Sequence, residues 1–208
     1  MRDDTLLQPG LNDPVLDSLR VFRAALKAMS EPGIETPLVE ETSIASLMPS
    51  TWALLLSLLD ANTSVWISPR LDHPALRANL VFHCNCPIVA ERGKADFAVL
   101  HHEDAFDLRE FNAGDPRRPD ESCTLVIQLP SLRGGVPMRW SGAGIPGERR
   151  VALPLDEAFW ILRARRNAFP LGLDIFFTSG RHLLGLPRTT RIINARIETS
   201  PIAVLEVA

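Results

Sequence analysis

The chain has 208 residues, of which 46% are hydrophobic and 23% are charged, and its formal net charge is −3. This composition is typical of a globular protein that is long enough to bury a substantial core. The absence of a basic excess argues against nucleic acid or an anionic membrane as the partner.

The sequence predicts neither a membrane span nor a signal peptide. No apolar run approaches the roughly 20 residues that a membrane span needs. The first ten residues, MRDDTLLQPG, lack the apolar core of a signal peptide. The three cysteines Cys84, Cys86 and Cys123 are an odd number, which favours free thiols over a disulfide framework. We therefore expect a cytoplasmic protein.

The first helix is predicted to begin at Asp13-Pro14, after an N-terminal segment of residues 1–12. Aspartate accepts hydrogen bonds from the first free N–H groups of a helix, and proline suits its first position. Pro32 and Gly33 end the helix. Apolar residues recur at spacings of three and four, which predicts one apolar face. These residues are Val15, Leu16, Leu19, Phe22, Leu26 and Met29, and Arg20, Arg23 and Lys27 lie mostly off that face.

The next elements are short and strongly apolar. Residues 52–59 are apolar nearly all round, which predicts a buried helix with Ser50 or Thr51 as its cap. A turn at 60–63 precedes a short buried strand at 65–67. A further helix is expected to start at Asp72-His73-Pro74 and to run to about Phe82.

The middle of the chain alternates between strands and polar segments. We expect a strand at 96–100, a helix at 104–111 and a strong strand at 123–129. Residues 112–121 form a polar loop that is rich in glycine and proline, but it is too short to join independent domains.

The last third predicts a mixed arrangement of elements. A strand at 138–141 leads into Gly142-Ala143-Gly144, and residues 156–167 form a helix with Phe159, Ile161 and Leu162 facing inward. Strands at 173–178 and 182–186 form a hairpin, and residues 192–207 alternate as a strand does until Pro201. Together these elements predict a single α/β domain, residues 13–208, with a mixed sheet.

A metal site is not supported by the residue spacing. His83, Cys84 and Cys86 lie close together, but zinc sites use three or four ligands, usually in Cys-x2–4-Cys pairs. Cys123, His101 and His102 would have to converge on them through folding. We expect no metal, and we interpret the cysteines as buried thiols.

Two turns carry anion-binding chemistry, each with a simpler alternative. The Gly142–Gly144 turn can present backbone N–H groups to an anion or be a plain tight turn. Arg188, Thr189 and Thr190 follow a strand, where they can bind phosphate or carboxylate or simply end the strand. Three carboxylates also lie beside turns: Glu31, Asp60 and Asp174. Asp60 can cap a helix or act as a base, and capping is the commoner role.

An ordered set of motifs resembles the PhnH family, a subunit of the bacterial carbon–phosphorus lyase system. The motifs are FRAALKAMSEPG (22–33), LLSLLDANTSVW (55–66), LVFHCN (80–85), TLVIQLPSL (124–132), GAGI (142–145), FPLGLD (169–174) and LPRTT (186–190). They extend from about residue 13 to residue 190, and their number and order make the match specific.

The resemblance implies a fold, a set of partners and a reaction. It implies a three-layer α/β sandwich, similar to the large domain of pyridoxal-phosphate-dependent transferases but without the cofactor site. It implies a homodimer that joins sister subunits in a core complex for alkylphosphonate catabolism. The step implied is the transfer of methylphosphonate to the ribose of ATP with displacement of adenine, which gives ribose 1-methylphosphonate 5-triphosphate. A phosphonate or an ATP-derived molecule is therefore a candidate ligand within that complex.

The positions of the lysines in the sequence also argue against a pyridoxal phosphate site. Pyridoxal phosphate forms a Schiff base with a lysine. The only lysines are Lys27, on the amphipathic helix, and Lys94, in a polar turn. Neither follows a strand in a way that would place it over a cofactor ring, so we expect no pyridoxal phosphate.

The candidate binding or interface residues are polar residues and glycines inside otherwise apolar motifs, and none of them is assigned a catalytic role. They are Arg23, Ser30, Glu31, Asp60, His83, Gly142, Gly144, Asp174, Arg188, Thr189 and Thr190. We expect Arg23, Glu31, His83, Arg188 and Thr189 to lie near one shared surface. Trp140 and Trp160 are candidates for exposed residues at the dimer interface.

Three readings of the function stay open at this point. The chain can be a non-catalytic assembly subunit, or it can contribute residues to a transferase site that forms only in the complex. A free-standing enzyme with the pyridoxal-phosphate fold is the least supported reading.

Overall fold

The computed structural model describes residues 6–104 and 107–194 of the chain. The helices are α1 (Pro14–Ser30), α2 (Pro49–Leu58), α3 (Pro74–Cys84) and α4 (Glu157–Arg166). The strands are β1 (Thr36–Pro37), β2 (Val65–Ile67), β3 (Phe97–His101), β4 (Thr124–Gln128), β5 (Pro137–Gly142), β6 (Ile145–Ala152), β7 (Asp174–Ser179), β8 (His182–Leu186) and β9 (Arg191–Asn194). Short 3-10 turns occur at Arg92–Lys94, Leu108–Glu110 and Pro119–Glu121.

A six-stranded mixed sheet forms the centre of the fold, with the strand order β1-β8-β7-β4-β3-β2. Strands β2, β3, β4 and β7 run parallel, whereas β8 is antiparallel to β7 and β1 is antiparallel to β8. The predicted α/β class and mixed sheet are therefore confirmed. A second, antiparallel sheet has the order β6-β5-β9.

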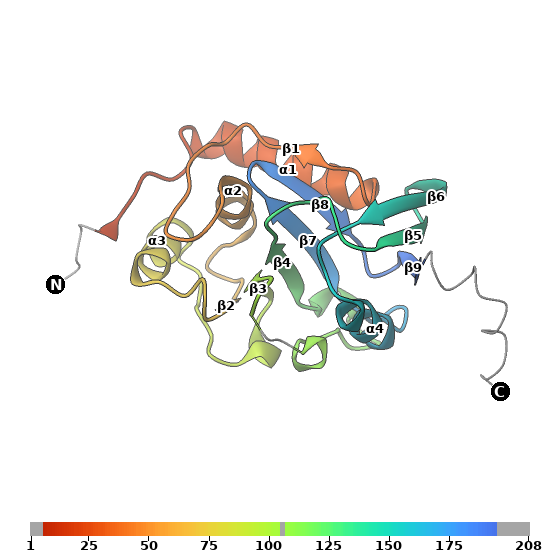
Figure 1. The fold of residues 1–208 in the computed structure, drawn as a ribbon. Helices are drawn as coiled ribbons and strands as arrows, with labels where there is room; N and C mark the ends of the chain where they lie inside the picture. The colour runs from red at the N-terminus through yellow and green to blue at the C-terminus, as the bar shows by residue number, and fades with distance from the viewer. Residues whose placement is uncertain (1–5, 105–106, 195–208) are drawn as a thin grey trace, which may run out of the picture.

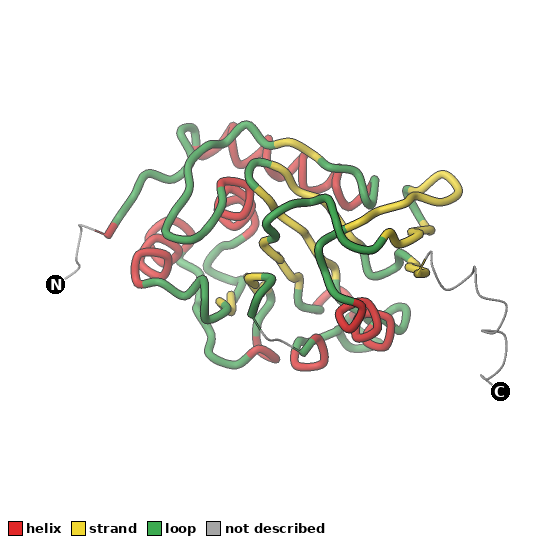
Figure 2. The backbone as a smooth tube through the Cα atoms, in the orientation of Figure 1, coloured by secondary structure: helices red, strands yellow, loops and turns green. Residues whose placement is uncertain are grey.

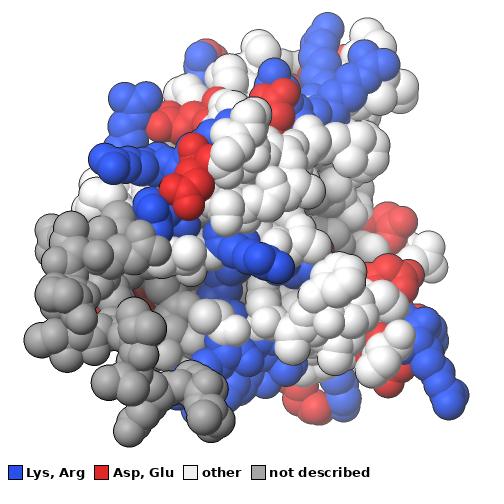
Figure 3. All heavy atoms as spheres, turned by 90° about the vertical axis from the view of Figure 1, so that its right-hand side faces the viewer, with Lys and Arg blue, Asp and Glu red and all other residues white. Residues whose placement is uncertain are grey.

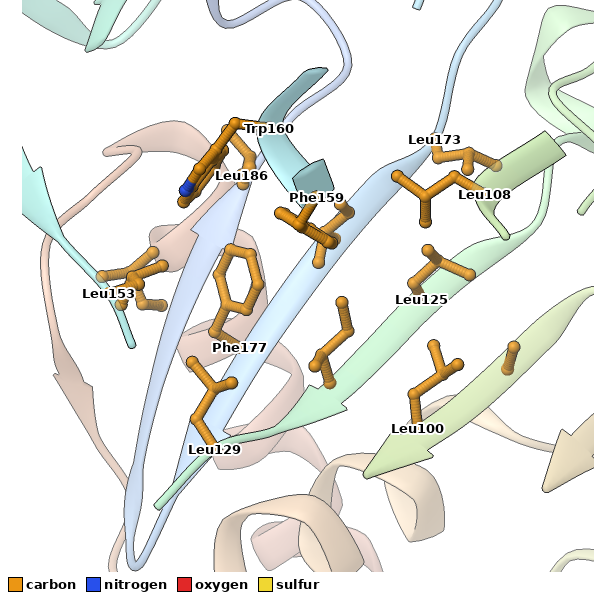
Figure 4. Packing of buried hydrophobic residues seen from close by; sticks show 14 of the residues in the cluster. Leu100, Leu108, Leu125, Leu129, Leu153, Phe159, Trp160, Leu173, Phe177 and Leu186 are labelled. Atoms are coloured by element: carbon orange, nitrogen blue, oxygen red, sulfur yellow. The ribbon is translucent and has the colours of Figure 1, made fainter. Parts of the chain in front are cut away.

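The central sheet lies between two layers. Helices α1, α2 and α3 cover one face, and α4 covers the other together with the small sheet (Figures 1 and 2). Strand β4 shows why, because its side chains alternate between the two sides. Leu125 and Ile127 belong to the apolar cluster that contains Phe159 and Trp160 of α4, whereas Val126 belongs to the cluster of the other helices. Figure 4 shows the first cluster, with the two aromatic rings of α4 over β7 and β8.

Helix α1 has the predicted bounds, but its large apolar residues do not face the core. The buried residues of α1 are Asp17, Val21, Ala25 and Ala28. Strand β8 approaches so closely that a Cβ on Gly185 would lie 2.4 Å from the carbonyl oxygen of Ala28. The helix therefore packs its small residues on the sheet and leaves the large ones outside. These exposed residues, here called the α1 stripe, are Val15, Leu16, Leu19, Phe22 and Leu26, with exposed fractions of 42–77%.

Two predictions in the first half of the chain are wrong in detail. Helix α2 begins at Pro49, so Ser50 and Thr51 are buried inside it and do not cap it. The Thr51 hydroxyl instead lies 2.9 Å from Oε1 of the buried Gln128 and 2.8 Å from the Thr178 hydroxyl. The helix predicted at 104–111 is, in its described part, only the 3-10 turn Leu108–Glu110, which Asp107 caps.

The second half of the chain needs three further corrections. In α4 the buried residues are Phe159, Trp160 and Arg163, whereas Ile161 is exposed. Trp140 and Trp160 are both buried, so the expectation that they are exposed interface residues is wrong. Strand β6 has no counterpart in the sequence prediction, because proline, glycine and three charged residues interrupt its apolar pattern.

The remaining elements agree with the sequence in position. Strands β2, β3, β4, β5, β7 and β8 lie where they are predicted, and α3 is capped by His73, whose Nδ1 accepts from the N–H of Ala75. Of the predicted tail 192–207, the part beyond Asn194 lies outside the described residues. No helix among the described residues is both long and apolar enough to cross a membrane.

Candidate functional site

The end of α1 is covered by the β5–β6 hairpin. The hydroxyl of Ser30 donates to the carbonyl of Lys27 at 3.0 Å, and Glu31 pairs with Lys27 at 3.6 Å. Gly144, in the hairpin turn, has a φ of +76°, and an added Cβ would lie 1.9 Å from the carbonyl oxygen of Ser30. Arg149 of β6 donates to the carbonyl of Pro32. The helix stop is thus a contact surface for the hairpin.

The same hairpin also contacts the connection between β8 and β9. An added Cβ on Gly142 would lie 3.5 Å from both the carbonyl oxygen of Thr189 and the Cα of Thr190. Strand β5 pairs with β9, and Ser141 lies opposite Arg191. The structure therefore brings three predicted turns together: the end of α1, the Gly142–Gly144 turn and residues 188–190.

Arg188 is held by several partners in the region between the sheet and the 112–121 loop. Its backbone N–H and its guanidinium donate to Asp174, at 2.7 Å and 2.6 Å. The guanidinium also donates to the hydroxyl of Ser122 and to the carbonyl of Pro119. Two of the predicted binding residues, Arg188 and Asp174, therefore bind each other and anchor the loop to β7.

Replacing Arg188 with alanine should lower the stability of the fold. The two side chains are only 15% and 27% exposed, so the change leaves Asp174 without its counter-charge. We expect a loss of about 2–3 kcal/mol in the free energy of unfolding. Urea denaturation followed by circular dichroism measures it. Arg133→Ala, which removes an exposed pair with Glu35, is the control and should leave the midpoint unchanged. Equal midpoints for the two variants would contradict an anchoring role for Arg188.

A cavity of about 560 Å³ opens beside residues 188–190. Helix α4 forms one wall, and the start of β9 forms another. It is lined by Trp160, Arg163, Ala164, Asn167, Phe169, Arg188, Thr189, Thr190, Arg191 and Ile192. This lining contains three arginines and no acidic residue. It is the polar cavity that the predicted residues Arg188, Thr189 and Thr190 share.

Helix α4 positions the segment that borders this cavity. Arg163 donates to the carbonyl of Thr190 at 3.1 Å and to that of Pro187 at 2.8 Å. Asn167 donates to the carbonyl of Arg188 at 3.1 Å. Burial lowers the pKa of Arg163 to about 10, and Asp174 partly opposes this effect, so the guanidinium is charged at neutral pH.

Sequence reasoning missed Arg163, Asn167 and Arg191. A signal for Arg163 was present, because it lies four residues after the inward-facing Phe159 and thus on the buried face of the predicted helix. A cation on such a face needs buried acceptors.

Three of the predicted site residues lie elsewhere. Asp60 accepts from the N–H of Asn62 in its own turn. His83 belongs to α3, and its Nε2 atom lies 2.9 Å from the carbonyl oxygen of Gln8. Figure 1 places α3 at the opposite end of the molecule from β9. Arg23 is exposed on α1. The described structure therefore does not place all of Arg23, Glu31, His83, Arg188 and Thr189 on one surface.

The face that carries β5, β6, β9 and α4 is rich in cations. Figure 3 shows Lys and Arg side chains spread over this face, from its top to its lower part, with Asp and Glu side chains among them. The last turn of α4 contains Arg163, Arg165 and Arg166, of which Arg163 is buried and Arg165 is exposed. This face therefore suits an anionic ligand better than a cationic one.

The histidines and cysteines do not assemble into a cluster. Cys84, Cys86 and Cys123 are free and buried, and burial raises the pKa of Cys123 to about 12. The rings of His101 and His102 lie 4.6 Å apart. Within residues 6–104 and 107–194, no three His, Cys, Asp or Glu side chains are arranged to hold a metal ion.

Comparison with known proteins identifies the family. Residues 9–193, which span α1 to β9, match the family described as "Bacterial phosphonate metabolism protein (PhnH)". The chain belongs to the PhnH family. The resemblance seen in the sequence motifs is thereby confirmed, and the protein is placed in bacterial phosphonate metabolism.

Two known proteins whose names refer to phosphonate metabolism are similar to the chain. One, from Rhizobium meliloti (strain 1021), is named "Alpha-D-ribose 1-methylphosphonate 5-triphosphate synthase subunit PhnH"; it is 33% identical over 191 residues, which cover 86% of this chain and 92% of the relative. Another, from Stutzerimonas stutzeri, is named "Putative C-P lyase subunit protein HtxG"; it is 35% identical over 81 residues, 38% of this chain and 42% of the relative. The first similarity covers nearly the whole length of both proteins.

Proposed function

We propose that this chain is a subunit of a carbon–phosphorus lyase core complex. With partner subunits it supports the transfer of methylphosphonate to the ribose of ATP, with displacement of adenine. The names of the relatives support this assignment. The observation of the structure that carries it is the α1 stripe, five large apolar side chains exposed along one helix. Contiguous apolar surface of this kind marks a site of protein association.

The α1 stripe fits a second copy of the same chain. Val15, Leu19, Phe22 and Leu26 follow one another at spacings of four, three and four residues, which is the pattern of a helix that packs along another helix. A two-fold axis would place the stripe of one protomer against that of its partner. Two of the neighbouring cations are already neutralised, because Arg20 pairs with Asp17 at 2.7 Å and Lys27 pairs with Glu31. We therefore propose a homodimer through α1.

The alternative to a catalytic role is that of a non-catalytic assembly subunit. The described residues favour this alternative, because they suggest no activity of the isolated chain. Arg188, Asp174, Asn167 and Arg163 are bound to one another or to the backbone. Such groups shape a site but include no nucleophile with an adjacent base. We propose that chemistry, if this subunit contributes to it, takes place only in the assembled complex, in the cytoplasm.

The pyridoxal-phosphate reading does not fit the lysines of the structure. Lys27 is exposed on α1 and pairs with Glu31, and Lys94 is exposed and pairs with Glu91 at 2.7 Å. Neither lysine lines the cavity beside α4. We propose that the fold is similar to the large domain of pyridoxal-phosphate-dependent transferases and that it carries no cofactor.

Co-expression with the other subunits of the carbon–phosphorus lyase core tests the subunit assignment. We expect native mass spectrometry of the purified material to show one complex that contains this chain in two copies, because the α1 stripe is self-complementary. A homodimer that leaves the other subunits behind would contradict membership of the complex. A chain that is monomeric alone and occurs once per complex would contradict the dimer.

A further inference from the structure

The cavity beside α4 has buried polar groups that no described atom satisfies. The Nε atom of Arg163, Oγ1 of Thr190 and Nε1 of Trp160 are buried and lack a hydrogen-bond partner among the described residues. All three side chains belong to the lining of the cavity, and Arg163 and Thr190 are each only 3% exposed. Each group can donate a hydrogen bond. Most buried polar groups in proteins are hydrogen-bonded, so three such donors in one cavity can accept oxygen atoms of a bound molecule or of water as partners.

The positive charge of the cavity is also incompletely balanced. Arg188 is neutralised by Asp174. Arg163 donates only to neutral carbonyls, and the carboxylate that acts on it, Asp174, is already paired with Arg188. No ion pair to Arg191 occurs within the described ranges. A buried guanidinium is costly without an anion nearby. Bound anionic oxygens would therefore be stabilised here.

The size and the apolar walls of the cavity indicate what the anion is attached to. Its volume, about 560 Å³, is larger than an inorganic anion needs and lies in the usual range of small-molecule sites. Trp160, Phe169 and Ile192 supply apolar surface on the walls, and Phe169 is 81% exposed. An organic group can lie against these side chains while its anionic end faces the arginines.

We propose that this cavity binds the phosphonate or phosphate group of a small organic molecule. Arg191 and the Thr190 hydroxyl contact the oxygens, and Arg163 supplies the buried positive charge behind them. The oxygens on one phosphorus atom can accept from several donors, and this cavity is lined by donors of α4, of β9 and of the residue before β9. The inference deepens the proposed function and rests on it for the identity of the ligand, because phosphonates and ATP both carry this group.

Isothermal titration calorimetry on the full-length chain, and on the co-purified complex, tests the site with three probes. The probes are methylphosphonate, inorganic phosphate and ATP, which separate a phosphonate, a free anion and a nucleotide phosphate as the source. We expect saturable binding of methylphosphonate or ATP. Arg191→Ala should weaken it about tenfold or more, because a charge-assisted contact to the oxyanion is lost. Thr190→Val, which removes only the unpaired hydroxyl, should weaken it less.

Arg165→Ala is the matched control. Arg165 is exposed on α4 but does not line the cavity, so the variant loses the same charge without losing a contact. An equal loss of affinity in Arg165→Ala and Arg191→Ala would overturn the site and leave only a general attraction of anions. Absence of binding of all three probes to both the chain and the complex would also overturn it. Neither result touches complex formation, which native mass spectrometry follows independently.

Discussion

Replacing Gly144 with alanine is expected to destabilise the fold by about 3 kcal/mol. Two costs add at this position. The φ of +76° belongs to the left-handed region, which disfavours a Cβ, and the added atom would lie 1.9 Å from the carbonyl oxygen of Ser30. Because the obstacle is backbone, the hairpin must move away from the end of α1. The midpoint of urea denaturation, followed by circular dichroism, measures the loss.

Gly147 provides a control in the same hairpin. Its φ is +70°, but nothing lies within 4 Å of the position of an added Cβ. Gly147→Ala should therefore show only the backbone cost, about 1–2 kcal/mol. The difference between the two variants measures the packing of the hairpin on α1. Equal losses would mean that the hairpin does not press on the helix, and that the helix stop at Ser30–Gly33 has only a local role.

This contact is the part of the candidate site that the sequence predicts least. Each turn is recognisable by itself: Pro32 and Gly33 end a helix, Gly142 and Gly144 make a tight turn, and residues 188–190 end a strand. Their convergence depends on β6, which the sequence does not reveal because Pro146, Gly147 and charged residues break its alternation. Local chemistry therefore predicts the parts, whereas a tertiary contact decides that they are neighbours.

Arg163 illustrates a second limit of the sequence. The periodicity of residues 156–167 predicts a helix with an inward face, and that helix is confirmed. A charged residue on the inward face is normally assigned to the surface, because the desolvation of a cation is costly. Here the connection between β8 and β9 supplies carbonyl acceptors from Pro187 and Thr190. Only the fold shows that those acceptors are within reach.

Helix α1 shows why an apolar face does not identify the core. The sequence predicts both the helix and its apolar side correctly. The side that packs on the sheet is chosen by the close approach of β8, which admits Ala25 and Ala28 but not leucine or phenylalanine. The stripe with the strongest apolar pattern thus remains exposed on the described chain. Periodicity identifies an apolar face, but it does not say whether the same chain covers that face.

The double variant Leu19→Glu with Phe22→Glu should convert the proposed dimer to a monomer. Both side chains are more than 40% exposed in the single chain, so the fold should tolerate the change. In a symmetric dimer the variant places four carboxylates in the interface and removes four apolar side chains from it. Full burial of each such side chain contributes about 1.5–3 kcal/mol to the free energy of association. We expect the dissociation constant to rise by about 1,000-fold or more. Sedimentation velocity at several concentrations measures the shift.

Val39→Glu serves as the control for this experiment, because Val39 is a large exposed apolar residue that lies outside the α1 stripe. It should leave the dimer intact, and both variants should keep the circular dichroism of the wild type. If the double variant remains a dimer, the interface lies on another face. If Val39→Glu dissociates equally well, added negative charge rather than lost apolar contact controls assembly. Selective dissociation of the double variant would assign the stripe to the partner protomer and leave the cationic face of α4 and β9 free for ligand.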